Sequence, residues 1–164
     1  MATKTDFLAI LQTMAGRGVD YIVVGGVAAV LQGAPVATFD LDLVHSREPE
    51  NLNLLLAALD FLEARYRTPG AETARPTYSH LVSPGHQLLM TRWGPLDLLG
   101  TIGEAQGYSE LLDRTVTLDA GQDLSVQVLD LSTLIQLKEQ LAHDKDRAVL
   151  AILRRTLEEK GKGS

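Results

Sequence analysis

Hydrophobic residues recur at helical spacing in four stretches of the chain. These stretches cover residues 5–15, 46–65, 132–142 and 144–159, and the second starts at Ser46, a residue type that commonly caps a helix. A shorter helix is expected at 27–31, where Gly33 ends it. Apolar, β-branched or alternating runs predict strands at 21–24, 38–44, 87–93, 96–99, 114–118 and 124–129. Strands joined by hairpins and mixed with helices predict an α+β, or mixed α/β, fold.

Residues 67–86 interrupt this periodicity. Three prolines and two glycines lie there among serine, threonine and histidine, which is typical of a long loop that serves as a lid or moves. The chain length favours one domain, which we expect over residues 1–160, followed by a frayed tail at 161–164.

Composition and charge exclude several classes of function for this chain. With 45% hydrophobic and 22% charged residues among 164, the chain is expected to be globular and soluble. A net charge of −6 argues against non-specific binding to duplex nucleic acid. The absence of cysteine excludes disulfides, thiol catalysis and cysteine-based metal sites. Without a long apolar run or a secretory signal, we expect a cytoplasmic protein with no membrane partner.

Acidic and apolar residues alternate over residues 39–44. This period of two predicts that Asp40 and Asp42 lie on one face of a strand. Acids on a strand commonly face water, and that interpretation stays open. A third acid, Asp97, lies between apolar residues, where a buried carboxylate needs a partner or a metal ion. If the three carboxylates converge, a hard divalent cation would offset their repulsion.

Two glycines, Gly25 and Gly26, join the first predicted strand to the short helix after it. Such a turn exposes backbone N–H groups to an anion, although an ordinary strand–helix turn has the same residues. The dinucleotide pattern G-x-G-x-x-G and a P-loop lysine are both absent.

The glycine pair, eleven intervening residues and the segment Thr38-Phe-Asp-Leu-Asp-Leu together resemble the signature of the nucleotidyltransferase superfamily related to DNA polymerase β. The local sequence is similar to the branch that includes AbiEii-type toxins. The resemblance implies a small mixed sheet flanked by helices, with a helical C-terminal segment. It also implies two sets of site residues: one set binds the triphosphate of an NTP, and a set of catalytic acids holds Mg²⁺ or Mn²⁺. The nucleotide-binding residues would be Gly25, Gly26 and Thr38, and the metal ligands Asp40, Asp42 and Asp97.

The C-terminal segment resembles the closing motif of the same branch. There a helical lysine, Lys138, would contact the triphosphate, and Asp146 would orient it or take part in catalysis. A solvated helix residue and an acid in a first helical turn are the alternatives for these two positions. The chain departs from the branch at Val36 and His143, where arginine is frequent. These departures leave open a different nucleotide, a different acceptor or a weakened enzyme.

The resemblance implies a metal-dependent enzyme that moves a nucleoside monophosphate from an NTP to an acceptor hydroxyl and releases pyrophosphate. The acceptor expected from the toxin branch is RNA, such as a tRNA 3′ end, or another toxin target, and an antitoxin protein would be a further partner. An enzyme that modifies an aminoglycoside or lincosamide is the alternative, because the acidic charge suits a cationic aminoglycoside better than RNA and the short chain leaves no second domain to bind RNA. If RNA is the acceptor, a homo-oligomer would supply the binding surface that one short chain lacks. A catalytically weak domain that binds a nucleotide or a protein is the third alternative.

Overall fold

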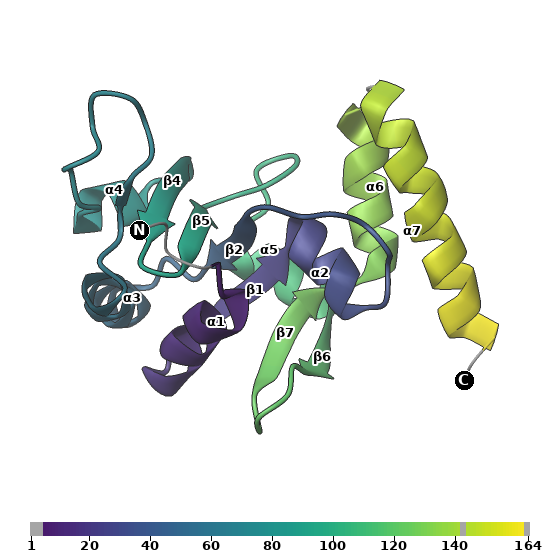
Figure 1. The fold of residues 1–164 in the computed structure, drawn as a ribbon, viewed down its shortest axis with the longest axis horizontal. Coiled ribbons are helices and arrows are strands. Elements are labelled where there is room, and N and C mark those ends of the chain that lie inside the picture. The colour runs from purple at the N-terminus through teal and green to yellow at the C-terminus, as the bar shows by residue number, and fades with distance from the viewer. Residues whose placement is uncertain (1–4, 142–143, 163–164) are drawn as a thin grey trace.

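The computed structural model describes residues 5–141 and 144–162, without the side chains of residues 141 and 144–146. A seven-stranded mixed sheet, with the strand order β3-β4-β5-β2-β1-β7-β6, forms the centre of the molecule (Figure 1). The strands are β1 (Tyr21–Val24), β2 (Leu41–His45), β3 (Arg65–Tyr66), β4 (His86–Thr91), β5 (Gly94–Leu99), β6 (Thr115–Asp119) and β7 (Ser125–Leu129). The helices are α1 (Phe7–Gly16), α2 (Gly25–Leu31), α3 (Pro49–Phe61), α4 (Tyr78–Val82), α5 (Tyr108–Leu111), the 3₁₀ helix η1 (Leu112–Arg114), α6 (Leu131–Leu141) and α7 (Asp144–Lys162). The mixed α/β class expected from the sequence is confirmed.

Several predicted boundaries differ from the structure, and the predicted helix over 46–65 ends at Phe61, with Arg65 in the short strand β3. Helix α3 begins at Pro49 rather than at Ser46, because proline is favoured in the first helical turn and Glu48 takes the capping position. The Ser46 hydroxyl instead accepts a hydrogen bond from the backbone N–H of Glu48 at 3.3 Å. The segment 67–86 is not one continuous loop, since Thr77 caps the short helix α4 inside it. Helix α7 continues beyond residue 159 to Lys162.

Strands β1 and β2 carry different partners on their two faces. Tyr21 and His45 are cross-strand neighbours three register steps from the pair Val24–Asp42, an odd number that places them on the opposite face of the sheet from Asp42. The hydroxyl of Tyr21 donates to the carbonyl oxygen of Leu11 in α1 at 3.4 Å. His45 Nε2 lies 2.8 Å from the carbonyl oxygen of Leu81 in α4. Helices α1 and α4 therefore cover the face that Asp42 does not use.

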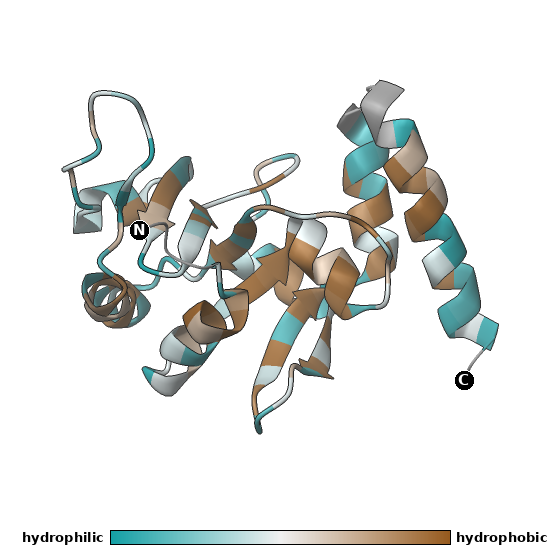
Figure 2. Cartoon of the chain, viewed as in Figure 1, coloured by the Kyte–Doolittle hydropathy of each residue, from teal (hydrophilic) through white to brown (hydrophobic). Residues whose placement is uncertain are grey.

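Helices α6 and α7 stand side by side at one end of the molecule, and α2 lies between them and the central strands (Figure 1). Gln32, directly after α2, connects these parts: its amide donates to the carbonyl oxygen of Leu129 at 2.9 Å and accepts from the Lys160 ammonium at 3.1 Å. Figure 2 shows mostly hydrophobic residues along β1 and β7, and mostly hydrophilic ones toward the C-terminal end of α7. In the part of the chain that the structure describes, no helix is long and apolar enough to span a bilayer.

Candidate active site

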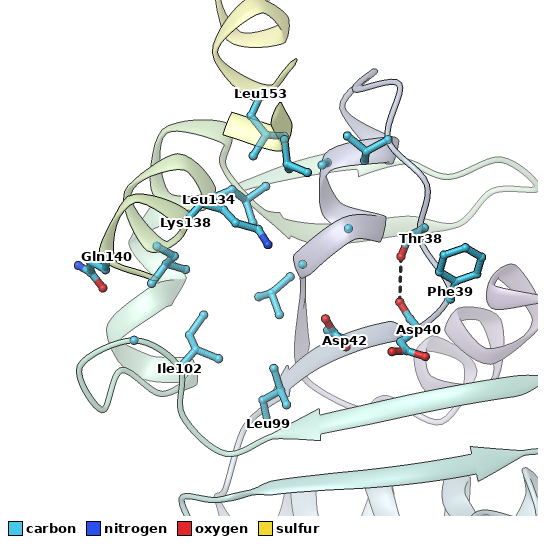
Figure 3. A pocket seen from close by; sticks show the side chains of 18 of the residues that line it. Thr38, Phe39, Asp40, Asp42, Leu99, Ile102, Leu134, Lys138, Gln140 and Leu153 are labelled. Carbon is cyan, nitrogen blue, oxygen red and sulfur yellow. Dashed lines mark hydrogen bonds between the residues drawn. The ribbon is translucent and has the colours of Figure 1, made fainter. Parts of the chain in front are cut away.

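A cavity of about 620 Å³ lies between α2, the segment before β2, the end of β5 and the α6–α7 pair (Figure 3). This volume is within the usual range for a small-molecule site. Much of the lining is apolar and comes from α6, α7 and the end of β5, including Leu99, Leu134 and Leu153. The opposite wall carries the polar side chains of Thr38, Asp40 and Asp42. A further charged side chain, Lys138, enters the cavity from α6. The cavity therefore combines an apolar body with a few charged groups.

Asp42 and Asp97 are neighbours in the sheet. Strands β2 and β5 are parallel, and their register pairs Asp42 with Asp97. Paired residues of adjacent strands point to the same face, so both carboxyl groups lie on the α2 side of the sheet. Asp42 lines the cavity, whereas Asp97 lies beside it and outside the lining. The structure thus brings together two of the three predicted acids through strand pairing.

The environment of Asp42 favours its neutral form. Burial, the charge of Asp97 and a hydrogen bond to Asp97 raise the pKa of Asp42 from 3.8 to about 7. The charge of Asp40 raises this pKa further, and the guanidinium of Arg67 lowers it. A cation placed at these carboxylates would relieve the same repulsion and return Asp42 to its ionised form.

Asp97 has a cationic partner that the sequence did not indicate. Nη2 of Arg67 lies 2.7 Å from Oδ1 of Asp97, and the two side chains are 23% and 13% exposed. Among the described residues, Oδ1 of Asp97 has no partner with hydrogen-bond geometry, so this contact is an ion pair without an aligned hydrogen bond. Nη1 of Arg67 donates to the carbonyl oxygen of Leu89 at 2.5 Å. The guanidinium is therefore held between β4 and β5.

Asp40 lies outside the strand that was predicted to contain it. Strand β2 begins at Leu41, because β1 ends at Val24, the partner of Asp42, and offers no residue opposite Asp40. The Thr38 hydroxyl donates to the carbonyl oxygen of Asp40 at 3.2 Å and fixes this segment (Figure 3). The prediction that a strand places both acids on one face is wrong at Asp40. Asp40 nevertheless lines the same cavity as Asp42.

The glycine pair makes room for two of these side chains. Gly25 has a φ of +67°, and a Cβ at this position would overlap the carboxyl group of Asp42. A Cβ on Gly26 would lie 2.7 Å from the Thr38 hydroxyl oxygen. Only glycine lets β1 and α2 approach Thr38 and Asp42 this closely.

Lys138 faces the acids across the cavity. Its ammonium group extends from α6 into the space toward which Asp42 points (Figure 3). Val36, where an arginine was expected from the resemblance, lines the apolar part of the cavity. Asp146 belongs to α7, but its side chain lies outside the described residues, as does His143. The role predicted for Asp146 stays a prediction.

The residues fit a divalent cation at Asp40 and Asp42. Both offer carboxylate oxygens, which Mg²⁺ and Mn²⁺ prefer, and the pKa of Asp42 is raised first by burial and then by the negative charges of Asp97 and Asp40. Within residues 5–141 and 144–162, however, no three Asp, Glu, His or Cys side chains come together closely enough to hold a metal ion. Asp97 is beside this pair but already contacts Arg67.

Comparisons with known proteins bear on the fold. No family model matches the chain, and no curated protein matches it. Among solved structures, the lincosamide antibiotic adenylyltransferase LnuA in its lincomycin-bound form matches with a TM-score of 0.63 and 14% identity, covering 93% of this chain and 98% of LnuA. TM1012 of Thermotoga maritima, inferred to be a nucleotidyltransferase, matches with a TM-score of 0.55 and 15% identity, covering 93% of this chain and 91% of that protein.

The chain has the nucleotidyltransferase fold. This finding confirms the fold that the resemblance implied from Gly25 to Asp42. The cavity, Asp42, Asp97 and Lys138 lie within this fold, and a fold alone does not fix a reaction.

Proposed function

We propose that the protein transfers a nucleoside monophosphate from an NTP to an acceptor hydroxyl and releases pyrophosphate. The observation that carries the proposal is the register that places Asp97 beside Asp42, at a cavity whose opposite wall carries Lys138. Carboxylates suit the metal ion that accompanies an NTP, and an ammonium group suits its phosphates. Acids paired across adjacent strands repel each other, and a cation bound at this position would offset the repulsion.

The proposed reaction uses these residues in separate ways. The acceptor oxygen attacks the α-phosphorus, the bond from that phosphorus to the bridging oxygen of the β-phosphate breaks, and pyrophosphate leaves with the electron pair. The hydroxyl proton passes to the carboxylate of Asp97, the acid of the pair that holds no metal ion. Lys138 orients the triphosphate, with Thr38 at the other side, and the resemblance adds Asp146. A divalent cation held by Asp40 and Asp42 would supply positive charge at the phosphate oxygens.

A small-molecule acceptor is supported better than RNA. The net charge of −6 disfavours a polyanion, and the cavity has the size of a small-molecule site. LnuA, which shares the fold, is a lincosamide adenylyltransferase. Beside Asp97, strand β4 presents two exposed apolar side chains: its cross-strand partner Leu88 is 42% exposed, and Met90 on the same face is 43% exposed, with Arg65 and Arg67 at their edge. This surface suits an acceptor with an apolar body rather than a polycationic aminoglycoside.

A domain that binds Mg–NTP without turnover is the second candidate function. Val36 in place of an arginine and the ion pair between Arg67 and Asp97 favour it, since both reduce the groups available to phosphate and metal. Tight binding of Mg–NTP with no pyrophosphate release on any acceptor would support this candidate.

Pyrophosphate release and label transfer from [α-³²P]NTPs test the proposal. Each of the four NTPs is incubated with Mg²⁺ and with lincosamides, aminoglycosides or total tRNA as acceptors. We expect label on a small-molecule acceptor, lost in Asp42→Asn and retained in Asp60→Asn, a control acid with a 77% exposed side chain. Label on tRNA would move the function to the toxin branch, with its antitoxin partner. Equal transfer by wild type and Asp42→Asn would contradict the site.

A further inference from the structure

Arg67 is held beside the candidate metal site by three contacts, two to the backbone of β4 and one to Asp97. Its backbone N–H donates to the carbonyl oxygen of Leu88 at 3.0 Å, and Nη1 donates to that of Leu89 at 2.5 Å. The remaining arm of the guanidinium, Nη2, lies 2.7 Å from Oδ1 of Asp97. The backbone of β4 therefore aims the cation at Asp97, and a swing away from it would leave a buried carboxylate without compensation.

The charges in the site favour one divalent cation rather than two. Asp40, Asp42 and Asp97 together carry −3 when ionised, and Arg67 carries +1. A single divalent cation brings the sum of these four groups to zero, whereas a second would leave +2, or +3 with the Lys138 ammonium across the cavity, before any nucleotide is bound. The guanidinium also occupies the side of Asp97 from which a metal ion would take the buried Oδ1.

We propose that Arg67 is a built-in second cation of this site. In the protein without nucleotide, one divalent cation binds through Asp40 and Asp42, and Asp97 is held by Arg67 instead of serving as a metal ligand. Arg67 is thus a positioning residue that sets how many metal ions the acids take and how tightly. The inference rests on the metal site of the proposed function, although it needs no catalytic turnover to be tested.

A double-mutant cycle measured by Mn²⁺ binding tests the inference. Free Mn²⁺ is followed by electron paramagnetic resonance in wild type, Arg67→Met, Asp97→Asn and the double variant, without nucleotide. We expect Arg67→Met to bind Mn²⁺ about tenfold more tightly or to take up a second ion, since a neighbouring positive charge is gone and Asp97 is released. The double variant is expected to bind Mn²⁺ like wild type, because it removes a neutral ion pair and no ligand.

The cycle separates this inference from its rivals. If Asp97 is a metal ligand in the wild-type protein, the double variant loses that ligand and binds Mn²⁺ about tenfold more weakly than wild type, which overturns the inference. Unchanged or weaker binding by Arg67→Met overturns it as well. The matched control is Arg75→Met, which removes the same charge from the exposed ion pair between Arg75 and Asp60. It is expected to leave Mn²⁺ binding unchanged.

Two further measurements keep the outcome decisive. If Arg67→Met does not fold, Arg67→Gln, which retains a donor for the carbonyl oxygen of Leu89, replaces it in the same cycle. Asp42→Asn in the wild-type background tests the metal site itself. If Asp42→Asn binds Mn²⁺ as wild type does, the proposed function fails together with the inference. If Asp42→Asn abolishes binding but the cycle shows Asp97 as a ligand, only the inference fails.

Discussion

Asp42 on β2 and Asp97 on β5 are in-register partners of two parallel strands, with both carboxyl groups on the face covered by α2. This relationship results from backbone pairing, so it does not depend on the conformation of a loop. It gives the molecule a pair of acids at the wall of a cavity, 55 residues apart in the chain. The proposed chemistry and the predictions below depend on this pair.

The contribution of Asp42 to the stability of the protein without metal is expected to decrease as pH rises from about 4 to about 7. The pKa of Asp42 is raised from 3.8 to about 7 in the folded state, so the folded protein binds more protons than the unfolded chain in that window. His45, whose pKa burial lowers, acts in the opposite direction and is present in both proteins to be compared. Thermal unfolding of wild type and Asp42→Asn across pH 4–8 checks this: Tm of the variant relative to wild type should increase with pH, by a few degrees in all.

Mg²⁺ should restore the stability that wild type loses as Asp42 ionises, and it should have no such effect in Asp42→Asn. A cation favours the ionised form of Asp42, so saturating Mg²⁺ at pH 7.5 should raise Tm of wild type more than that of Asp42→Asn. An equal shift in both proteins would place the cation away from Asp42. Differential scanning calorimetry with and without Mg²⁺ makes the comparison.

Gly26→Ala should damage the site more than it damages the fold. The new methyl group would lie 2.7 Å from the Thr38 hydroxyl oxygen, and displacement of Thr38 would cost about 1–3 kcal/mol of the free energy of unfolding. Gly16→Ala, where the added methyl meets no atom within 4 Å among the described residues, is the matched control. NTP affinity by calorimetry, with urea unfolding beside it, should show a loss in Gly26→Ala only.

Lys138→Met should weaken NTP binding about tenfold, because a charge-assisted contact to phosphate is worth roughly 1.5–3 kcal/mol. The effect should appear in KM rather than in kcat, and it should shrink at high salt. Lys162→Met, at the exposed end of α7, removes the same charge outside the cavity and should change neither constant. A loss of equal size in both variants would mean that Lys138 acts only through the net charge.

The sequence predicted the fold class and the residues of the candidate cavity from Gly25 to Asp42, but it could not predict features that depend on long-range pairing. Alternation identified Asp42 correctly as a strand residue, because burial on the two faces of β2 imposes that pattern. The same alternation failed at Asp40, where pairing with β1 has already ended at Val24. Strand pairing is a long-range property, and no periodicity in residues 38–44 records where the partner strand stops.

Arg67 could not have been predicted for a related reason. It follows a two-residue strand inside a segment rich in proline and glycine, and no hydrophobic pattern there indicates an edge strand. The apolar residues around Asp97 did indicate that this acid needs a partner. The apolar neighbours of Asp97 could not show whether its partner is a metal ion or a guanidinium. Asp146 remains a prediction from resemblance, since its side chain is outside the described residues.

The destination of each phosphorus atom tests the central claim most directly. Wild-type protein is given Mg²⁺ and the acceptor with either [α-³²P]NTP or [γ-³²P]NTP, in parallel with Asp42→Asn. The α-label should appear on the acceptor and the γ-label in pyrophosphate, with both products reduced about 100-fold or more in the variant. Transfer of the γ-label to the acceptor, or equal α-label transfer by wild type and variant, would contradict nucleotidyl transfer at this site.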